Sequence, residues 1–424
     1  MPGPLPRASQ PTCQRHDPPK VIGERHGRSP MTEPVRSVLM VTREMSGDRR
    51  YGLGRSLMPV VDALLERGWR VRYLCQEDLT PAAKASRNLW LSRLGRLPGA
   101  ATRPHVRQVI GALAERLQMG WFAAHIARDD DCTTVHLHDP WLGFGFWLGH
   151  LWLRMRDVRW GITEHGFGSY SRATHEDGLI QGPRLQRWLR RLEAFTLRRA
   201  HWVTAPTQLA LDQLARDLAL PFNPPHWHAI SHAAPSTATM GREAACQSLG
   251  WVAQDFHVLG VGRLVTLKRF DILVAACASM ADRYPKVHLH LLGEGDRGGL
   301  QQLADSMGFG SRIHFAMVDD VRPYYAAADV YVSTSATESF GLANFEALMA
   351  GLPSICTAVG GVPEVMGTGA WLIPVEQQAL VAALGELISQ PAQRQLLSER
   401  AHLRARQAPN LEAVVNQYVR LFLQ

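Results

Sequence analysis

Apolar runs of strand length alternate with amphipathic segments along the first half of the chain. The apolar runs are residues 35–42, 68–74, 134–140, 160–168 and 201–207. Between them, segments such as 56–67, 182–200 and 208–218 repeat apolar residues at the spacing of one helix face. This alternation is typical of βαβ units, and it predicts a parallel sheet of Rossmann type.

The second half repeats this plan after a change in composition. Residues 221–235 are rich in Pro and His, which predicts a domain boundary. Further apolar runs follow at 255–262, 288–292, 313–318 and 328–332, and helical spacing at 342–350, 380–388 and 411–423. We therefore expect five segments: a disordered extension (1–34), an N-terminal Rossmann-like domain (35–235), a linker (236–254), a C-terminal Rossmann-like domain (255–407) and a C-terminal helix (408–424).

Several features bear on the location of the protein. Residues 1–30 are rich in Pro, Arg and Ser and lack the apolar stretch of a signal peptide, so disorder is expected there, with Met31 as an alternative start. The most apolar segment, 141–152, is shorter than the roughly 20 residues of a membrane span, and it predicts a buried helix. Six scattered cysteines indicate neither a zinc site nor a disulfide framework. These features predict a cytoplasmic protein.

The charge of the chain favours anionic partners. The formal net charge is +8, and suitable partners include nucleotide sugars, anionic membrane and nucleic acid. No zinc-finger spacing or RNA-binding aromatic strand supports nucleic acid. Segment 88–127, which is basic at helical spacing, is either a solvated helix face or a surface that contacts the inner face of a membrane, and 182–200 is a second basic helix.

Candidate ligand-binding residues follow the predicted strands, because doubly wound sheets bind ligands at the carboxyl ends of their strands. His138 and Asp139 end one run and His165 ends the next, although histidines in such places are also structural. Arg263 and Lys268 follow the strand at 255–262 and can clamp a diphosphate, with plain surface charge as the alternative. The loops at 46–55 and after residue 292 add Gly52, Gly54, Arg55, Gly293 and Glu294, with a plain tight turn as the alternative for the glycine pair at 52 and 54.

Residues 334–346 concentrate the candidate chemistry. The predicted helix start supplies backbone amides that can hold a phosphate: those of Phe340, Gly341 and Leu342. Glu338 precedes this helix and Glu346 lies roughly one turn inside it. One carboxylate can reach the sugar side of a nucleotide diphosphate sugar and the other the ribose hydroxyls. Two solvated surface acids are the alternative interpretation.

The spacing from Glu338 to Glu346, followed by Gly360-Gly361-Val362-Pro363-Glu364, resembles the Glu-x7-Glu signature of the retaining glycosyltransferases of family 4. Gly262-Arg263-Leu264 with Lys268 is similar to a second family segment, although Arg269 stands where the family has Gly. His232-Ala233 likewise lacks a Gly that the family has. The resemblance covers most of the chain from about residue 35. It implies a GT-B fold, in which two Rossmann-like domains face one another across a cleft.

The resemblance also implies an activity. A family 4 enzyme moves a sugar, with retention, from a nucleotide diphosphate sugar to a glycan, lipid-linked or small-molecule acceptor, here in cell-envelope polysaccharide or glycolipid synthesis. The implied catalytic residues are Glu338, His165, Arg263 and Lys268, with His138 and Asp139 on the acceptor side. An Asp-x-Asp motif in a suitable setting is absent, so we expect no metal ion or other cofactor, the cations and helix amides stabilising the leaving group. A nucleotide-sugar epimerase or hydrolase of the same fold, or a non-catalytic basic binding protein, is the alternative.

Overall fold

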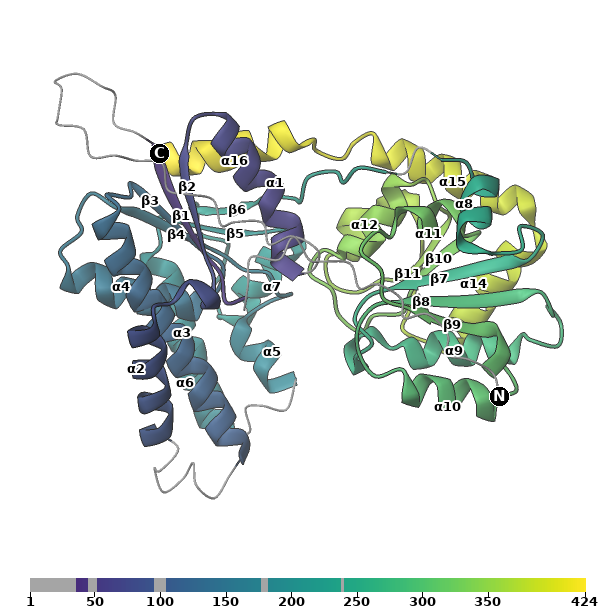
Figure 1. The fold of residues 1–424 in the computed structure, drawn as a ribbon, viewed down its shortest axis with the longest axis horizontal. Coiled ribbons are helices and arrows are strands. Elements are labelled where there is room, and N and C mark those ends of the chain that lie inside the picture. The colour runs from purple at the N-terminus through teal and green to yellow at the C-terminus, as the bar shows by residue number, and fades with distance from the viewer. Residues whose placement is uncertain (1–35, 45–51, 95–103, 177–181, 238–239) are drawn as a thin grey trace, which may run out of the picture. The chain divides into compact units, whose positions relative to one another are not determined.

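The computed structural model describes residues 36–44, 52–94, 104–176, 182–237 and 240–424. The predicted extension, residues 1–34, lies outside these residues. Within them, the chain forms two six-stranded sheets (Figure 1). Every strand pair in both sheets is parallel. The predicted α/β architecture with two Rossmann-like sheets is therefore confirmed.

The first sheet has the strand order β2-β1-β3-β4-β5-β6. Its strands are β1 (Ser37–Val41), β2 (Arg70–Leu74), β3 (Thr134–Leu137), β4 (Arg159–Thr163), β5 (Trp202–Ala205) and β6 (Trp227–Ala229). The accompanying helices are α1 (Gly52–Glu66), α2 (Pro81–Leu94), α3 (Pro104–Asp129), α4 (Pro140–Trp152), α5 (Tyr170–Glu176), α6 (Pro183–Arg199) and α7 (Gln208–Asp217). Strands β1, β3 and β5 are buried along their whole length, as expected for strands covered on both faces.

The second sheet has the order β12-β11-β10-β7-β8-β9. Its strands are β7 (Phe256–Val261), β8 (Val287–Leu292), β9 (Ile313–Ala316), β10 (Val330–Ser333), β11 (Ser354–Thr357) and β12 (Trp371–Ile373). The later helices are α8 (Arg242–Leu249), α9 (Phe270–Ser279), α10 (Gly298–Ser306), α11 (Arg322–Ala327), α12 (Leu342–Met349), α13 (Val362–Met366), α14 (Gln377–Ser389), α15 (Pro391–Ala405) and α16 (Leu411–Leu423).

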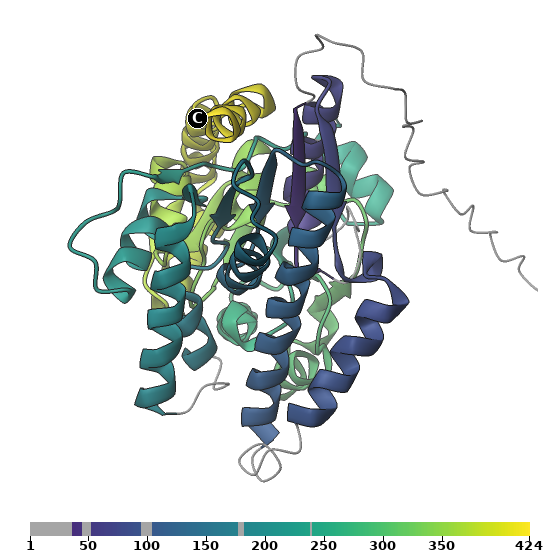
Figure 2. The same cartoon turned by 90° about the vertical axis from the view of Figure 1, so that its left-hand side faces the viewer.

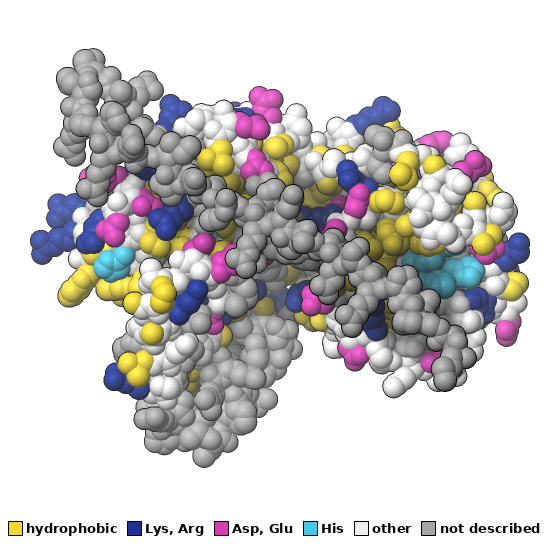
Figure 3. Space-filling view, in the orientation of Figure 1, with side chains coloured by type: hydrophobic (Ala, Val, Ile, Leu, Met, Phe, Trp, Pro, Cys, Tyr) yellow, Lys and Arg dark blue, Asp and Glu magenta, His cyan; other side chains and the backbone are white. Residues whose placement is uncertain are grey.

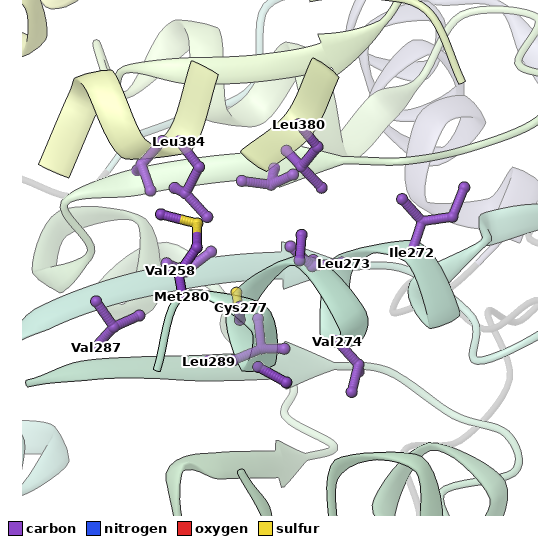
Figure 4. Packing of buried hydrophobic residues seen from close by; sticks show 14 of the residues in the cluster. Val258, Ile272, Leu273, Val274, Cys277, Met280, Val287, Leu289, Leu380 and Leu384 are labelled. Atoms are coloured by element: carbon purple, nitrogen blue, oxygen red, sulfur yellow. The ribbon is translucent and has the colours of Figure 1, made fainter. Parts of the chain in front are cut away.

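Apolar side chains fill the space between sheets and helices. In the second sheet, Val258 and Leu289 from the strands pack with Leu273 of α9 and Leu384 of α14 (Figure 4). Beside the first sheet, α4 contacts both α3 and α6 (Figures 1 and 2). Helices α3 and α4 approach so closely that a Cβ atom at Gly120 would lie 2.1 Å from the carbonyl oxygen of Leu142. Glycine is therefore required at this crossing.

The C-terminal helix returns to the first sheet. Figure 1 shows α16 running alongside α1. Val415 and Phe422 of α16 join the core that contains Val38 and Met40 of β1. The last residues of the chain therefore complete the core around its first strand.

Each sheet has a point where the strand order reverses, and such points position ligands. In the first sheet the reversal lies between β1 and β3, and in the second between β7 and β10. The carboxyl ends of β3 and β4 lead to His138 and His165. Those of β7 and β10 lead to Arg263 and to the segment that ends at Glu338.

Strand β6 lies inside the predicted boundary segment, and α8 lies inside the predicted linker. Two other local predictions need correction. Gly52, Gly54 and Arg55 belong to the first turn of α1 instead of a loop, because the Glu44 carboxylate holds the amides of that turn. The predicted buried helix, α4, is buried only in part, since its last turn is exposed.

Of the helices within the described ranges, none combines the length and the apolar character that a membrane crossing requires.

Candidate active site

Two loops meet at the reversal point of the second sheet. The amide of Ala336 donates to the carbonyl oxygen of Leu267 at 2.8 Å. The Thr334 hydroxyl donates to the carbonyl oxygens of Lys268 (3.0 Å) and Arg269 (2.8 Å). These bonds fix the loop after β7 against the loop after β10. Residues that are about 70 positions apart in the sequence thereby reach one site.

Lys268 and Glu338 form an ion pair across these two loops. The Ser335 hydroxyl donates a second hydrogen bond to the same Glu338 oxygen, Oε1, at 2.9 Å. Both charged side chains are mostly buried but keep some exposure to solvent. Arg263 is exposed, and none of the described residues forms an ion pair or hydrogen bond with its side chain. Lys268 of the predicted cation pair is therefore bound to the predicted catalytic acid, whereas Arg263 has no such partner in the described part of the chain.

The Gly360-Gly361 pair packs against the backbone of Glu338 and holds it in place. The amide of Gly361 donates to the Glu338 carbonyl oxygen at 2.9 Å. A Cβ atom at Gly360 would lie 1.8 Å from that oxygen, and Gly360 has a φ of +56°. Only glycine meets both conditions without strain. This explains the role of the glycines that follow the two glutamates in the sequence.

The N-terminus of α12 carries no side-chain cap. Its first flanking residue, Gly341, has a left-handed φ of +80°, and its neighbour Phe340 is buried. At the start of α1, by contrast, the Glu44 carboxylate accepts hydrogen bonds from the amides of Leu53 (2.6 Å) and Gly54 (3.1 Å). Within the described residues, the start of α12 thus offers amide donors that no side chain caps, and a positive helix end, beside Glu338. That combination suits an anionic group.

Glu346 lies inside α12 and is almost fully buried. Its Oε1 atom is 2.7 Å from Nη2 of Arg55, and its Oε2 atom accepts a hydrogen bond from the Tyr325 hydroxyl at 3.0 Å. Burial raises the pKa of the Glu346 carboxyl, and the Arg55 charge and the Tyr325 hydrogen bond oppose that rise. All three residues line a cavity of about 900 Å³ that also includes Phe345 and Leu342. The cavity is large enough for a nucleoside-sized ligand.

Histidines gather at the carboxyl ends of β3 and β4. Nδ1 of His138 lies 2.9 Å from Nε2 of His165, and the two rings are stacked. Burial, with smaller contributions from neighbouring histidines, lowers the pKa of both imidazoles well below the usual value. Both are therefore neutral at neutral pH. His232 lowers both pKa values further, and its ring packs edge-on against Phe340 at 4.7 Å, next to the start of α12.

The chain matches two family models. The model described as Glycosyltransferase Family 4 matches residues 51–227, and the model described as Glycosyl transferases group 1 matches residues 241–404. Together they include the second sheet, strands β2 to β5 of the first sheet and the paired glutamates. This chain is a member of glycosyltransferase family 4.

Individual relatives extend this finding. A D-inositol 3-phosphate glycosyltransferase of Corynebacterium urealyticum is 33% identical over 38% of this chain and 41% of its own length. The lipopolysaccharide core biosynthesis glycosyltransferase LpsE of Rhizobium meliloti is 32% identical over 39% of this chain and 48% of its own. The match therefore spans less than half of the length of these curated relatives.

Solved structures share the fold. Sucrose-phosphate synthase from Thermosynechococcus elongatus superposes with a TM-score of 0.71 at 20% identity, covering 92% of this chain and 98% of that one. Anabaena HepE in complex with UDP-glucose gives 0.66 at 18% identity, covering 91% and 98%. The predicted GT-B fold is confirmed.

Other candidates in this family 4 chain have structural partners. The Asp139 carboxylate caps α4 through the amide of Trp141 (2.8 Å) and accepts from Nε of Arg116 (3.0 Å). A Cβ atom at Gly293 would lie 1.9 Å from the carbonyl oxygen of Gly262, so this glycine lets the ends of β7 and β8 approach. Glu294 is exposed, and its carbonyl oxygen accepts from the Leu264 amide at 2.7 Å.

The structure adds residues that the sequence did not single out. Ser335, Tyr325 and Glu44 each orient a predicted site residue or helix start through the hydrogen bonds described above. Glu164, which directly precedes His165, is buried with Oε1 unpaired among the described residues, and burial with the nearby Glu193 charge raises its pKa well above the usual value. The one sequence signal that could have identified Glu164 is its position at the carboxyl end of a predicted strand.

Proposed function

We propose that this protein transfers a sugar from a nucleotide diphosphate sugar to a glycan, lipid-linked or small-molecule acceptor, with retention at the anomeric carbon. The bond from the anomeric carbon to the diphosphate breaks, and a bond to an acceptor hydroxyl forms on the same face. The hydroxyl proton leaves with the diphosphate. We further propose a role in cell-envelope polysaccharide or glycolipid synthesis, which the name of LpsE supports.

One observation carries this proposal: the Lys268–Glu338 ion pair lies beside the uncapped start of α12 at the reversal point of the sheet. A departing diphosphate gains negative charge, and preorganised cations and amides lower the cost of that change. Lys268, Arg263 and the α12 amides supply such donors. Glu338 then opposes the positive charge that develops at the anomeric carbon.

We propose that the nucleoside of the donor binds in the cavity beside Glu346. A carboxylate accepts hydrogen bonds from two neighbouring ribose hydroxyls, and the buried Glu346 has two oxygens for them. These oxygens now engage Arg55 and Tyr325, so ribose binding exchanges at least one of these partners. The structure of HepE with UDP-glucose supports a uridine donor for this fold.

The acceptor is assigned to the histidine pair of the first sheet. Neutral imidazoles donate and accept hydrogen bonds at once, which suits uncharged sugar hydroxyls. His165 is the residue of this pair that we place nearest the reacting sugar. The Asp139 carboxylate already accepts hydrogen bonds from the Trp141 amide and from Arg116. We therefore propose that Asp139 positions α4 and does not bind the acceptor itself.

The test combines binding and transfer. Thermal shift with UDP and other nucleoside diphosphates identifies the donor base, because a ligand at 100 times its Kd stabilises by about 2.7 kcal/mol. Transfer from the matching radiolabelled nucleotide sugar is then measured with Arg263→Gln and with Arg283→Gln, an exposed arginine away from the site, as control. We expect Arg263→Gln to lose about 2–4 kcal/mol of transition-state stabilisation, and the control to lose none.

Other outcomes favour other functions. Release of free or epimerised sugar without an acceptor would indicate a hydrolase or epimerase of the same fold. Binding without any turnover would indicate a non-catalytic protein.

We also propose that no metal ion takes part, because no Asp-x-Asp motif adjoins the site in the sequence. Turnover that EDTA abolishes and Mn²⁺ or Mg²⁺ restores would contradict this.

A further inference from the structure

Helix α6 concentrates arginine on its outer side. Six of its 17 residues are arginines: Arg184, Arg187, Arg190, Arg191, Arg198 and Arg199. Its one acid, Glu193, is fully buried and accepts hydrogen bonds from the amides of Tyr170 (2.7 Å) and Ser171 (3.0 Å). The outer face of α6 therefore carries positive charge that no acid of the helix offsets.

The arginines form a stripe with aromatic residues. Positions 184, 187, 188, 191, 195 and 198 follow the spacing of one helix face. Among the described residues, no ion pair or hydrogen bond engages the side chains of Arg184, Arg187 or Arg191. Trp188, in the same stripe, is 52% exposed. We call positions 184, 187, 188, 191, 195 and 198 the α6 stripe.

A groove and an apolar edge adjoin the α6 stripe. Five arginines of α6 and Phe195 line a groove of about 600 Å³. Phe195 contacts Trp147 of α4 at 4.8 Å, and the Arg199 guanidinium lies over the Trp147 ring at 5.4 Å. Beyond Trp147, the last turn of α4 exposes apolar side chains: Leu148, Leu151 and Trp152, the last 74% exposed. Charge and apolar surface thus adjoin one another on neighbouring helices.

We propose that the α6 stripe and the exposed end of α4 dock this protein onto an anionic membrane. Arginines of an interfacial helix pair with lipid phosphates while their stems lie along apolar surface. Tryptophans prefer the boundary between headgroups and acyl chains. Leu148 and Leu151 favour a membrane over nucleic acid, because aliphatic side chains enter lipid but do not stack on bases. The proposal concerns residues away from the donor site and does not depend on the proposed transfer reaction.

The first experiment measures partition of the full chain onto vesicles by flotation. Phosphatidylcholine vesicles are compared with vesicles that also contain phosphatidylglycerol. We expect binding to the anionic vesicles that weakens with salt. The variant Arg184→Gln/Arg187→Gln/Arg191→Gln should lose about 100-fold in partition coefficient, since each basic residue near an anionic surface contributes roughly fivefold. The control Arg283→Gln/Arg400→Gln/Arg420→Gln removes the same charge from exposed positions elsewhere and should retain binding.

A second experiment tests the apolar part. Trp188→Gln and Trp152→Gln should each weaken partition severalfold, and the blue shift of tryptophan fluorescence on vesicle binding should shrink in both. All variants must keep the wild-type melting temperature. Three results would each overturn the proposal: no partition onto anionic vesicles, an equal loss in the control triple variant, or binding of duplex DNA through the α6 stripe without vesicle binding.

Discussion

Glu338 and Glu346 carry the same charge in different surroundings. Glu338 lies in a loop, shares one oxygen with Lys268 and Ser335, and keeps some exposure to solvent. Glu346 lies in a helix, and both of its oxygens have partners in Arg55 and Tyr325. We therefore propose that Glu338 responds to charge that changes during the reaction. For Glu346 we propose that it holds a polar group of constant charge.

These surroundings predict opposite kinetic effects for two matched variants. Glu346→Gln removes an interaction that is equal in ground and transition states, so the donor KM should rise with little change in kcat. Glu338→Gln removes charge that acts in the transition state, so kcat should fall by about 2.7–4 kcal/mol of activation free energy. Steady-state kinetics with a radiolabelled donor measure both. A Glu338→Gln enzyme with wild-type kcat, beside a Glu346→Gln enzyme that has lost it, would reverse the two roles.

Arg269 shows what sequence can and cannot predict about this site. It adopts a left-handed conformation, with φ at +48°, at the position where the family resemblance predicts a glycine. This conformation costs a non-glycine residue roughly 1–2 kcal/mol. The Thr334 hydroxyl bonds to the carbonyl oxygens on both sides of the turn and helps to maintain it. Spacing predicted which residues follow each strand, but partners such as Thr334, Tyr325 and Glu44 depend on long-range contacts that no local pattern records.

At the scale of elements, segments with a clear apolar pattern were predictable, and segments without one were not. Periodicity identified α6 and α7, and apolar runs identified β1 and β7, because each buries a clear face. Strand β6 has only three residues in a segment rich in Pro and His, a composition that indicates a loop. Strand β6 forms because it pairs with β5, although its own sequence does not favour a strand. Sheet neighbours thus override weak local preference.

Histidines occupy adjacent strands of the second sheet, and Figure 3 shows histidine side chains gathered over it. His257 faces His288 in the register of β7 and β8, and His290 faces His314 in that of β8 and β9. Trp251 stacks on His290 with ring centroids 3.7 Å apart. Nδ1 of His257 lies 3.0 Å from Nε2 of His290, so the two nitrogens share one proton. This row of histidines, formed by His257, His288, His290 and His314, therefore favours neutral imidazoles.

This row predicts acid sensitivity. Burial first, and then the charges of His314, His257 and His288, lower the pKa of His290 to about 2. Below the usual pKa of about 6.5 the unfolded chain binds a proton that folded His290 does not, so the free energy of unfolding decreases as pH falls. At one pH unit below that usual pKa, His290 lowers the free energy of unfolding by about 1.4 kcal/mol relative to its value at high pH.

His290→Phe keeps the ring on Trp251 but removes the titration. Urea unfolding of both proteins from pH 7.5 to 5.5 measures the effect, and the variant should lose less stability than the wild type across this range. Equal losses in the two proteins would show that His290 binds its proton in the folded state, against the burial argument.

At the scale of the whole molecule, the fold depends on a contact between the ends of the described chain. The apolar spacing of 411–423 predicted a helix but not its partner, because amphipathicity reports that one face is buried and not against what. The partner is the first sheet: Phe422 packs on Trp69 and Trp202, with ring centroids at 5.8 and 5.6 Å. Stability of the N-terminal sheet should therefore depend on the last turn of the chain.

Neighbouring residues of α16 give a matched test of this dependence. Phe422 is 3% exposed and Leu423 is 53% exposed. Phe422→Ala leaves a cavity in the core that contains Val38 and Met40, and it should cost about 3–5 kcal/mol. Leu423→Ala should change stability by no more than about 0.5 kcal/mol. Hydrogen exchange localises the effect: in Phe422→Ala the amides of β1 should exchange faster, while those of β8 keep their protection. If both variants behaved alike, or if only the second sheet lost protection, α16 would contribute little to the N-terminal core.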